Sequence, residues 1–413
     1  MSIQIDRSRF IETMETQADI GGTENGGLHR LTLSDTDKEV RDWFLGAMAD
    51  AGLETRVDEM GNMFGRRSGT DPSADPVLVG SHLDSQPYGG IYDGALGVVA
   101  ALELIRTLND EGIETSHPIE IVNWTNEEGS RFQPAMQGSG VWAGAHDIET
   151  EYEKTDADGV RLLDELERIG YRGDEPAEPR EPYHAYLELH PEQGPRLEET
   201  GADVGIVTGI VGLRWAEVTF EGQANHSGTT PMHYRDDALV AAADVVTALR
   251  RLPGTLGEAS VATVGSLTVE PNSVNIVPET VRFTTDVRDP DEATLDRGVE
   301  RMEAEVAAAA EREGVDYDIE HTMRASSVDF ADRPVEAVAD AVDALGYDGR
   351  RLVSGAGHDA THAAAVCDTA MVFAVSEDGK SHTEDEFTSW PDCYRSATVL
   401  ANAALDLAER GDR

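Results

Sequence analysis

Apolar and polar residues follow two different patterns along this chain. Before residue 211, continuous apolar runs alternate with polar loops. The runs "DPVLVGSHLDS" (Asp75 to Ser85) and "PIEIVNW" (Pro118 to Trp124) are typical of buried strands that end in loops. Between them, "GALGVVAALELIRTL" (Gly94 to Leu108) is apolar nearly all round, which predicts a central helix. This strand–helix–strand order indicates an α/β sheet that carries its functional loops at strand ends.

A second pattern begins at Gly212. The runs "WAEVTFEG", "VATVGSLTVE" and "VRFTTDVRD" alternate apolar and polar residues, as half-buried strands do, and two long amphipathic helices lie among them. The first pattern returns after about residue 325 with the strand "TAMVFAV" and a last helix from Asp392. We therefore predict an α/β domain of residues 1–211 and 326–413, with a mixed sheet flanked by helices. A smaller α+β domain of residues 212–325 interrupts it.

A helix is also predicted near the beginning of the chain. Thr36-Asp37-Lys38-Glu39 has the pattern of a capping box, and Gly52 is a plausible stop. The apolar residues between them fall on one helical face. They are Val40, Trp43, Phe44, Ala47 and Met48.

Composition restricts the class of protein and its partners. The chain has 413 residues, of which 39% are apolar, so it is globular and long enough for two or three domains. Its net charge is -47, from 33 basic and 80 acidic residues. Such a surface repels nucleic acid and anionic membranes, and we expect neither as a partner. The charge is typical either of a very soluble protein or, as we favour, of one adapted to high salt.

Cysteine usage and the apolar runs bear on the compartment. Cys367 and Cys393 form no CxxC pair, which fits a reduced cytoplasm better than a disulfide framework. The first ten residues lack a signal-peptide pattern, and no apolar run reaches about 18 residues. We therefore expect a cytoplasmic protein.

The first predicted strand ends in residues suited to binding metal. His82 and Asp84 lie two positions apart, so the aspartate can orient the imidazole while the other ring nitrogen binds a cation. Asp93 follows in a glycine-rich loop, and its carboxylate can bridge two cations. The simpler alternative is a turn with a solvated aspartate and a surface histidine.

The next strand ends in "WTNEEGSRF", where Glu127 and Glu128 are adjacent. Two carboxylates side by side repel each other unless a cation lies between them. One can then bind the metal while the other holds and deprotonates a water molecule. Taken alone, the pair is more typical of an ordinary acidic turn in a chain with 80 acidic residues.

Two further strand ends carry histidines. "LELHPEQGP" contains His190 and Gln193, and "SEDGKSHTEDEF" contains His382. Each histidine alone is more typical of a strand end without any ligand role. Four strand ends that each supply a histidine or a carboxylate favour a two-metal site for Zn, Mn, Co or Ni.

The predicted inserted domain adds three candidates. His226 lies in a Gly/Ser/Thr turn, and Asn275 and Arg288 suit a hydrogen-bonded grip on a substrate carboxylate. The alternatives are a surface histidine and an arginine paired with Asp286 or Asp289.

Taken together, these residues resemble a known family. The chain is similar to the M20-type metallopeptidase superfamily, within it the amidase/hydantoinase/carbamoylase group, from about Gly26 to the C-terminal helix. The resemblance rests on motifs in this order: "GSHLDSQPYGGIYDGALGV", "NEEGSRFQPAMQGSGVWAG", "LELHPEQGPRLE", "GQANHSGTTPMHYRDDAL", "NSVNIVPE", "DVRDP", "SGAGHDA" and "DGKSHTEDEF".

The resemblance implies a role for each matching residue. Asp84 matches the acid that orients His82, Glu127 the general base, and His226 a histidine that stabilises an oxyanion from the partner subunit or after lid closure. Residues 212–325 match a lid and dimerisation domain. The implied ligands of two divalent ions are His82, Asp93 as bridge, Glu128, His190 and His382. The implied substrate-binding positions are Gln193, His226, Asn275, Arg288 and the backbone near Gly357.

The resemblance also implies an activity. It predicts a homodimeric amidohydrolase that cleaves the ureido C–N bond of an N-carbamoyl amino acid, α or β, which bears a carboxylate. The nearest alternative is an allantoate amidohydrolase. An aminoacylase or dipeptidase fits less well, because "EEGSRF" and "HPEQGP" resemble the ureido group better. A non-catalytic binding homologue also fits less well, because every ligand position and Glu127 are filled.

The acidic surface generates a prediction about salt. If the charge of -47 reflects adaptation to high salt, removing salt restores self-repulsion and the protein unfolds at low ionic strength. Thermal unfolding followed from low to molar KCl measures this. Stability that is unchanged across that range would contradict the prediction.

Overall fold

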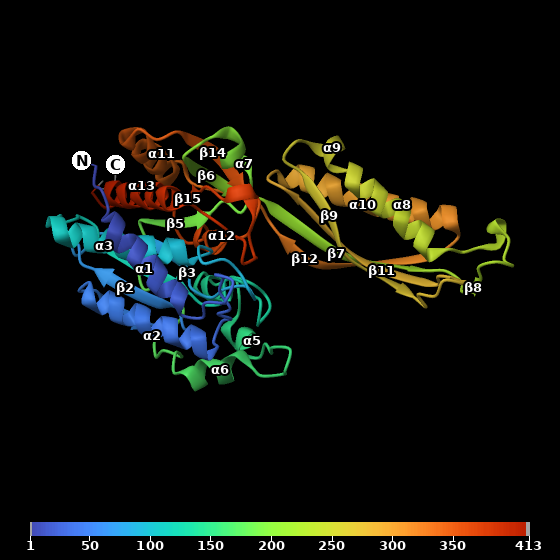
Figure 1. The fold of residues 1–413 in the computed structure, drawn as a ribbon, viewed down its shortest axis with the longest axis horizontal. Coiled ribbons are helices and arrows are strands. Elements are labelled where there is room, and N and C mark those ends of the chain that lie inside the picture. The colour runs from blue at the N-terminus through green and yellow to red at the C-terminus, as the bar shows by residue number, and fades with distance from the viewer. Residues whose placement is uncertain (1, 410–413) are drawn as a thin grey trace. The chain divides into compact units, whose positions relative to one another are not determined.

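The computed structural model describes residues 2–409, which form two compact units. The larger unit runs to Thr208 and resumes at Phe330, and the smaller unit is Gly209–Asp329. The sequence placed these junctions at 211/212 and 325/326. The predicted α/β fold, a mixed sheet flanked by helices, is confirmed in the larger unit (Figure 1).

The sheet of the larger unit has a parallel centre and antiparallel margins. Its strand order is β1-β2-β4-β3-β5-β15-β6, with β14 paired to β6. Strands β4, β3, β5 and β15 run parallel, so their carboxyl ends meet at one edge. The bounds are β1 Glu54–Val57, β2 Met63–Arg67, β3 Val77–His82, β4 Ile119–Trp124, β5 Ala185–Pro191, β6 Val204–Ile210, β14 Gly349–Ser354 and β15 Thr369–Ala374.

Every residue of the four parallel strands is buried, because structure covers both faces of a parallel sheet. Helix α3 (Ala95–Glu111) packs on β3 and β5, and α13 (Trp390–Glu409) packs beside it. α11 (Asp332–Leu345) lies against α13, and α1 (Arg7–Asp19) lies against α3. The apolar run predicted as a central helix is thus confirmed as one.

Two glycines bring backbones into direct contact under the functional edge. A Cβ atom on Gly97 of α3 would lie 2.3 Å from the carbonyl oxygen of Leu189. A Cβ atom on Gly80 of β3 would lie 2.0 Å from the carbonyl oxygen of Val122. The helix and strands therefore pack more closely here than any side chain permits.

Helix α2 (Asp35–Asp50) corrects one prediction. Its N-cap is Ser34, whose hydroxyl accepts from the Asp37 amide, so the capping box predicted at Thr36–Glu39 is wrong by two residues. Asp37 instead accepts from the Leu33 amide and forms a buried ion pair with Arg41. The helix begins earlier because the Ser34 hydroxyl already accepts a hydrogen bond from the free amide of Asp37. Val40, Phe44, Ala47 and Met48 of the predicted face are buried, whereas Trp43 is partly exposed.

The smaller unit has its own sheet and core. The strand order is β12-β7-β11-β9, all antiparallel, and α8 and α10 pack against the sheet and each other (Figure 1). Its core includes Phe220, Val245, Phe283 and Val306. The bounds are β7 Gly212–Glu221, α8 Ala238–Arg251, β9 Val261–Glu270, β11 Thr280–Asp289, α10 Glu292–Glu313 and β12 Asp316–Ala325.

Shorter elements complete both units. They are α4 Gln137–Trp142, α5 Ile148–Tyr152, α6 Leu162–Ile169, α7 Arg196–Thr200, β8 Asn225–His226, α9 Pro253–Leu256, β10 Ile276–Val277, β13 Val328–Asp329 and α12 Ala360–Ala363. Within residues 2–409, no helix is both long and apolar enough to cross a membrane.

The close packing of α3 generates a stability prediction. Gly97→Ala forces the helix away from β5 and should lower the free energy of unfolding by about 1–3 kcal/mol. The matched control is Gly46→Ala in α2, where a Cβ atom has nothing within 4 Å and should stabilise the helix by about 0.5–1 kcal/mol. Urea unfolding followed by tryptophan fluorescence, in molar salt, compares the two. Equal effects at both sites would contradict the packing explanation.

Candidate active site

The carboxyl ends of the four parallel strands bring the predicted residues together. His82 ends β3 and pairs in register with Trp124, the last residue of β4. His190 lies near the end of β5, in register with Phe373 of β15. Glu127 and Glu128 follow β4, and His382 lies in the segment that follows β15.

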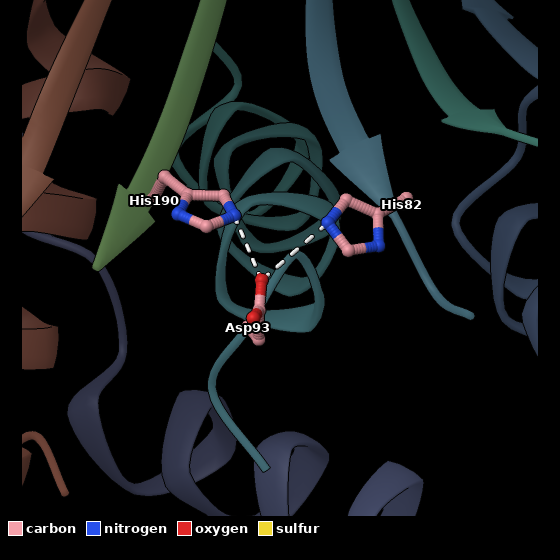
Figure 2. A group of neighbouring side chains, drawn as sticks. All are labelled: His82, Asp93 and His190. Carbon is pink, nitrogen blue, oxygen red and sulfur yellow. Dashed lines mark ion pairs between the residues drawn. The ribbon is translucent and has the colours of Figure 1, made fainter. Parts of the chain in front are cut away.

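His82, Asp93 and His190 form the first group of side chains that can hold a metal ion. Figure 2 shows both imidazoles directed at the Asp93 carboxylate from neighbouring strands. Asp93 Oδ1 lies 2.9 Å from His190 Nε2 and 3.6 Å from His82 Nε2. All three residues are buried.

The hydrogen bonds of the two imidazoles leave Nε2 available. Nδ1 of His82 lies 3.0 Å from the carbonyl oxygen of Asp84, and Nδ1 of His190 lies 3.0 Å from that of Pro191. A carbonyl oxygen only accepts, so each Nδ1 carries the proton. His82 Nε2 is buried without any hydrogen-bond partner among the described residues, which fits a nitrogen that binds a cation.

Asp93, Glu128 and His382 form the second group. His382 Nε2 lies 3.6 Å from Asp93 Oδ2 and 3.7 Å from Glu128 Oε2. Asp93 therefore offers one oxygen to each group, as a bridging carboxylate does. Gln86, which sequence reasoning missed, donates to Glu128 from its backbone amide and its carboxamide, both at 2.9 Å.

Asp84 organises the turn that carries the two glutamates. Its carboxylate accepts the amides of Glu127 at 3.2 Å and Glu128 at 3.3 Å. The same carboxylate lies 3.8 Å from His82 Nδ1, farther than the Asp84 carbonyl oxygen. Asp84 thus contacts His82 more closely through its backbone carbonyl than through its carboxylate. The Asp84 carboxylate instead holds the backbone of Glu127 and Glu128.

Burial and mutual repulsion dominate the electrostatics. Burial raises the pKa of Glu127 and of Glu128 well above its ordinary value, and nearby carboxylates add to this effect. Burial opposes protonation of His82, yet the charges of Glu127 and Asp93 raise its pKa well above the usual range. The group is thus short of positive charge, and its imidazole and carboxylate donors suit Zn, Mn, Co or Ni.

A second layer of buried polar groups lies behind the histidines and was missed by sequence reasoning. The His358 ring lies 4.4 Å from that of His190, and burial lowers its pKa well below the usual range. Glu188 accepts from Ser81 at 2.8 Å and from the Ala360 amide at 2.9 Å. Only "SGAGHDA" gave any signal of this layer, because every residue of β5 is buried and burial therefore does not distinguish Glu188.

The implied substrate-binding residues of the larger unit have these surroundings. Gln193 Nε2 donates to Asp93 Oδ2 at 3.1 Å and to Ser381 Oγ at 2.9 Å. Gly357 lies beside Met136, whose terminal carbon would be 3.2 Å from a Cβ atom on that glycine.

Of the candidates in the smaller unit, His226 lies on β8, Asn275 directly precedes β10 and Arg288 lies on β11. His226 pairs in register with Ile276, next to Asn275. His226 Nδ1 accepts the amides of Gly228 at 3.0 Å and Thr229 at 3.2 Å, so in the neutral ring Nε2 carries the proton and donates. Arg288 forms an ion pair with Asp286 at 2.8 Å.

The chain is similar to known proteins over nearly its whole length. Residues 78–406 match the family described as "Peptidase family M20/M25/M40". The chain is 45% identical to an N-carbamoyl-L-amino-acid amidohydrolase of Rhizobium meliloti, over 98% of this chain and 97% of the relative. It is 34% identical to an allantoate amidohydrolase of Bacillus subtilis (strain 168), over 97% of each.

A solved structure is similar throughout. The crystal structure of an amidase of the hydantoinase/carbamoylase family from Burkholderia multivorans aligns with a TM-score of 0.95. The two sequences are 46% identical, and the alignment covers 98% of each chain.

The raised pKa values generate a prediction about pH and metal. Glu127 and Glu128 bind protons more tightly in the folded state, so their contribution to stability is present below about pH 4.3 and lost as pH rises above it. The raised pKa of His82 gives a loss in the same direction above about pH 6.5. The metal-free protein should therefore lose stability from pH 5 to 8.

Added Mn²⁺ binds the ionised groups, so its stabilising effect should grow over that range, to about 2.7 kcal/mol at 100 times its Kd. Melting temperatures with chelator and with Mn²⁺, measured at pH 5, 6, 7 and 8, test this. A metal-induced shift that is the same at every pH would contradict the assignment. Glu128→Gln, which removes one of the repelling charges, should flatten the pH dependence.

Proposed function

This chain belongs to peptidase family M20/M25/M40, and we propose that within it the chain hydrolyses the ureido C–N bond of N-carbamoyl amino acids. The products would be the amino acid, CO2 and ammonia. The observation that carries this proposal is Asp93, which offers one carboxylate oxygen to each of two adjoining groups of metal ligands. The relative named for N-carbamoyl-L-amino acids supports the substrate class.

Two divalent ions, held by these five side chains, would supply positive charge that acidifies a water molecule and polarises a carbonyl oxygen. Glu127 is the general base. The residue is 8% exposed, its carboxylate lies 3.5 Å from His82 Nε2, and it belongs to neither ligand group. It accepts the proton of water and passes it to the leaving nitrogen.

The smaller unit supplies the groups that meet the substrate. His226 presents Nε2–H as a donor to the oxyanion, since two backbone amides hold Nδ1. Asn275 and Arg288 bind the substrate carboxylate, with Asp286 fixing the position of the guanidinium before substrate arrives. Closure of this unit as a lid, in the same or a partner subunit, would complete the site.

We infer a homodimer formed through the smaller unit. Strand β9 is an edge of its sheet, and Val261 and Leu267 on it are 51% and 41% exposed. An edge strand with exposed apolar side chains is suited to pairing with a second copy of itself.

The proposal also covers the cellular compartment, the metal ions and the salt conditions of the protein. Cys367 and Cys393 are both free, which supports a reducing compartment such as the cytoplasm. Zn or Mn are the proposed ions, with Co or Ni as substitutes that the same donors accept. The net charge of -47 supports a halophilic protein.

Allantoate is the second candidate substrate. It carries the same ureido group, and a relative covering 97% of this chain bears the name allantoate amidohydrolase. The residues proposed to bind cations and move protons are the same for both substrates.

Ammonia release distinguishes the two. The metal-loaded protein, in high salt, is given N-carbamoyl-L-amino acids, β-ureidopropionate and allantoate in parallel. We expect turnover of a carbamoyl amino acid. Turnover of allantoate alone selects the second candidate, and turnover of none, with metal bound, contradicts both.

Replacing Glu127 tests its role as base. Glu127→Gln should lower kcat by about 10²–10⁴-fold, because the amide cannot accept the proton, while two ions remain bound. Metal content by elemental analysis accompanies the rate measurement. The control is Glu149→Gln on the exposed surface of α5, which should leave kcat unchanged. A Glu127→Gln enzyme that turns over at the wild-type rate would refute the assignment.

A further inference from the structure

A chain of hydrogen bonds connects Asp93 to the segment that carries His382. Gln193 Nε2 donates to Asp93 Oδ2 at 3.1 Å and to Ser381 Oγ at 2.9 Å. Ser381 Oγ in turn lies 2.8 Å from Glu386 Oε2. The chain thus ends at a carboxylate to which no role has been given so far.

The order of donors along this chain is fixed by its two ends. The Ser381 hydroxyl has one hydrogen, which it donates to Glu386. The Asp93 carboxylate only accepts, so the amide group of Gln193, and not its carbonyl, faces both Asp93 and Ser381. With the carboxamide reversed, its oxygen would meet the Asp93 carboxylate and repel it.

Glu386 is held in place by close packing. It is 5% exposed, and a Cβ atom on Gly90 would lie 2.2 Å from its Oε1. The Glu386 carboxylate therefore packs directly against the glycine-rich loop that carries Asp93. Glu386 lies four residues after His382, so one segment supplies a ligand and the support of the bridging ligand.

These contacts leave Gln193 without a free N–H donor for a substrate carboxylate. Both hydrogens of its amide are donated within the protein, to Asp93 and Ser381. Only its carbonyl oxygen remains, and a carboxylate cannot donate to it.

We propose that Ser381 and Glu386 are positioning residues, which hold the Gln193 amide so that it orients Asp93 Oδ2 toward Glu128 and His382. The proposal rests on the two-ion assignment made above and does not depend on the identity of the substrate. It gives Gln193 a role in support of the second ligand group, beside the substrate contact that the family resemblance implies.

The test is Mn²⁺ binding to the full chain after removal of metal, in molar KCl, by calorimetric titration. Glu386→Leu and Ser381→Ala should each weaken one of two binding steps by about 10–100-fold, the usual cost of losing a group that orients a ligand. His382→Ala identifies which step belongs to the second group. Glu386→Gln, which keeps an acceptor for Ser381, should retain most of the affinity.

Glu384→Leu is the matched control. Glu384 belongs to the same segment and accepts from Thr23 and from Asn25, but it has no link to Asp93. This variant should therefore bind both ions with nearly wild-type affinity. Melting temperatures of the metal-free variants verify folding, and Ser381→Ala, the smaller change, carries the test if Glu386→Leu does not fold.

Three outcomes would overturn the proposal. In the first, Glu386→Leu and Ser381→Ala bind both ions normally. In the second, Glu384→Leu weakens binding as much as they do, which makes the effect a general one of the segment. In the third, the wild-type protein binds fewer than two ions, which also removes the two-ion assignment itself. Normal ion binding by the wild type without turnover of any ureido substrate contradicts the proposed function alone.

Discussion

Mutual repulsion among buried carboxylates is the constraint on which this site depends. Asp84, Asp93, Glu127 and Glu128 are each at most 8% exposed and lie at one edge of one sheet. Ionised carboxylates that lie close together and are shielded from water are unstable without positive charge between them. The protein compensates this charge only in part, through hydrogen bonds from backbone amides and from Gln86 and Gln193, and through the nearby His82 and His190. Two divalent ions would supply the remaining charge.

The fold opposes this repulsion with a rigid support. The four parallel strands are buried along their whole length, and Gly80 and Gly97 let strand and helix backbones touch beneath the site. Three site loops turn sharply through residues with positive φ, namely Asn126, Gln193 and His382, at φ of 56°, 57° and 56°. Such conformations cost about 1–3 kcal/mol each and persist only where tertiary contacts hold them. The side chains are therefore oriented before any ion or substrate binds.

The smaller unit is built separately from the sheet that carries the candidate metal ligands. It has its own sheet and its own apolar core, so it can contribute donors without sharing the burial that the metal ligands need. The backbone amides around His226 fix its tautomer, and Asp286 fixes Arg288. In the proposed reaction, both groups would serve as donors toward negative charge on the substrate.

The sequence alone predicted the architecture and the side chains that the structure groups as candidate metal ligands. Continuous apolar runs predicted the buried strands, and a histidine or carboxylate after each one predicted the site, because parallel strands end at one edge. It did not predict α1, whose buried face is only Phe10, Thr13, Met14 and Gln17, or the correct capping residue of α2. Both depend on which polar groups tertiary packing buries.

Tertiary structure decided how each ligand is held. That the Asp84 carboxylate accepts the amides of Glu127 and Glu128, and that Gln86 fixes Glu128, follow from contacts between residues more than 40 positions apart. The hydrogen bonds of Gln193 to Asp93 and to Ser381 also join residues 100 or more positions apart. Sequence spacing shows which chemical groups are available at a strand end. Hydrogen-bond direction depends on what lies within about 3 Å, and only the folded chain fixes that.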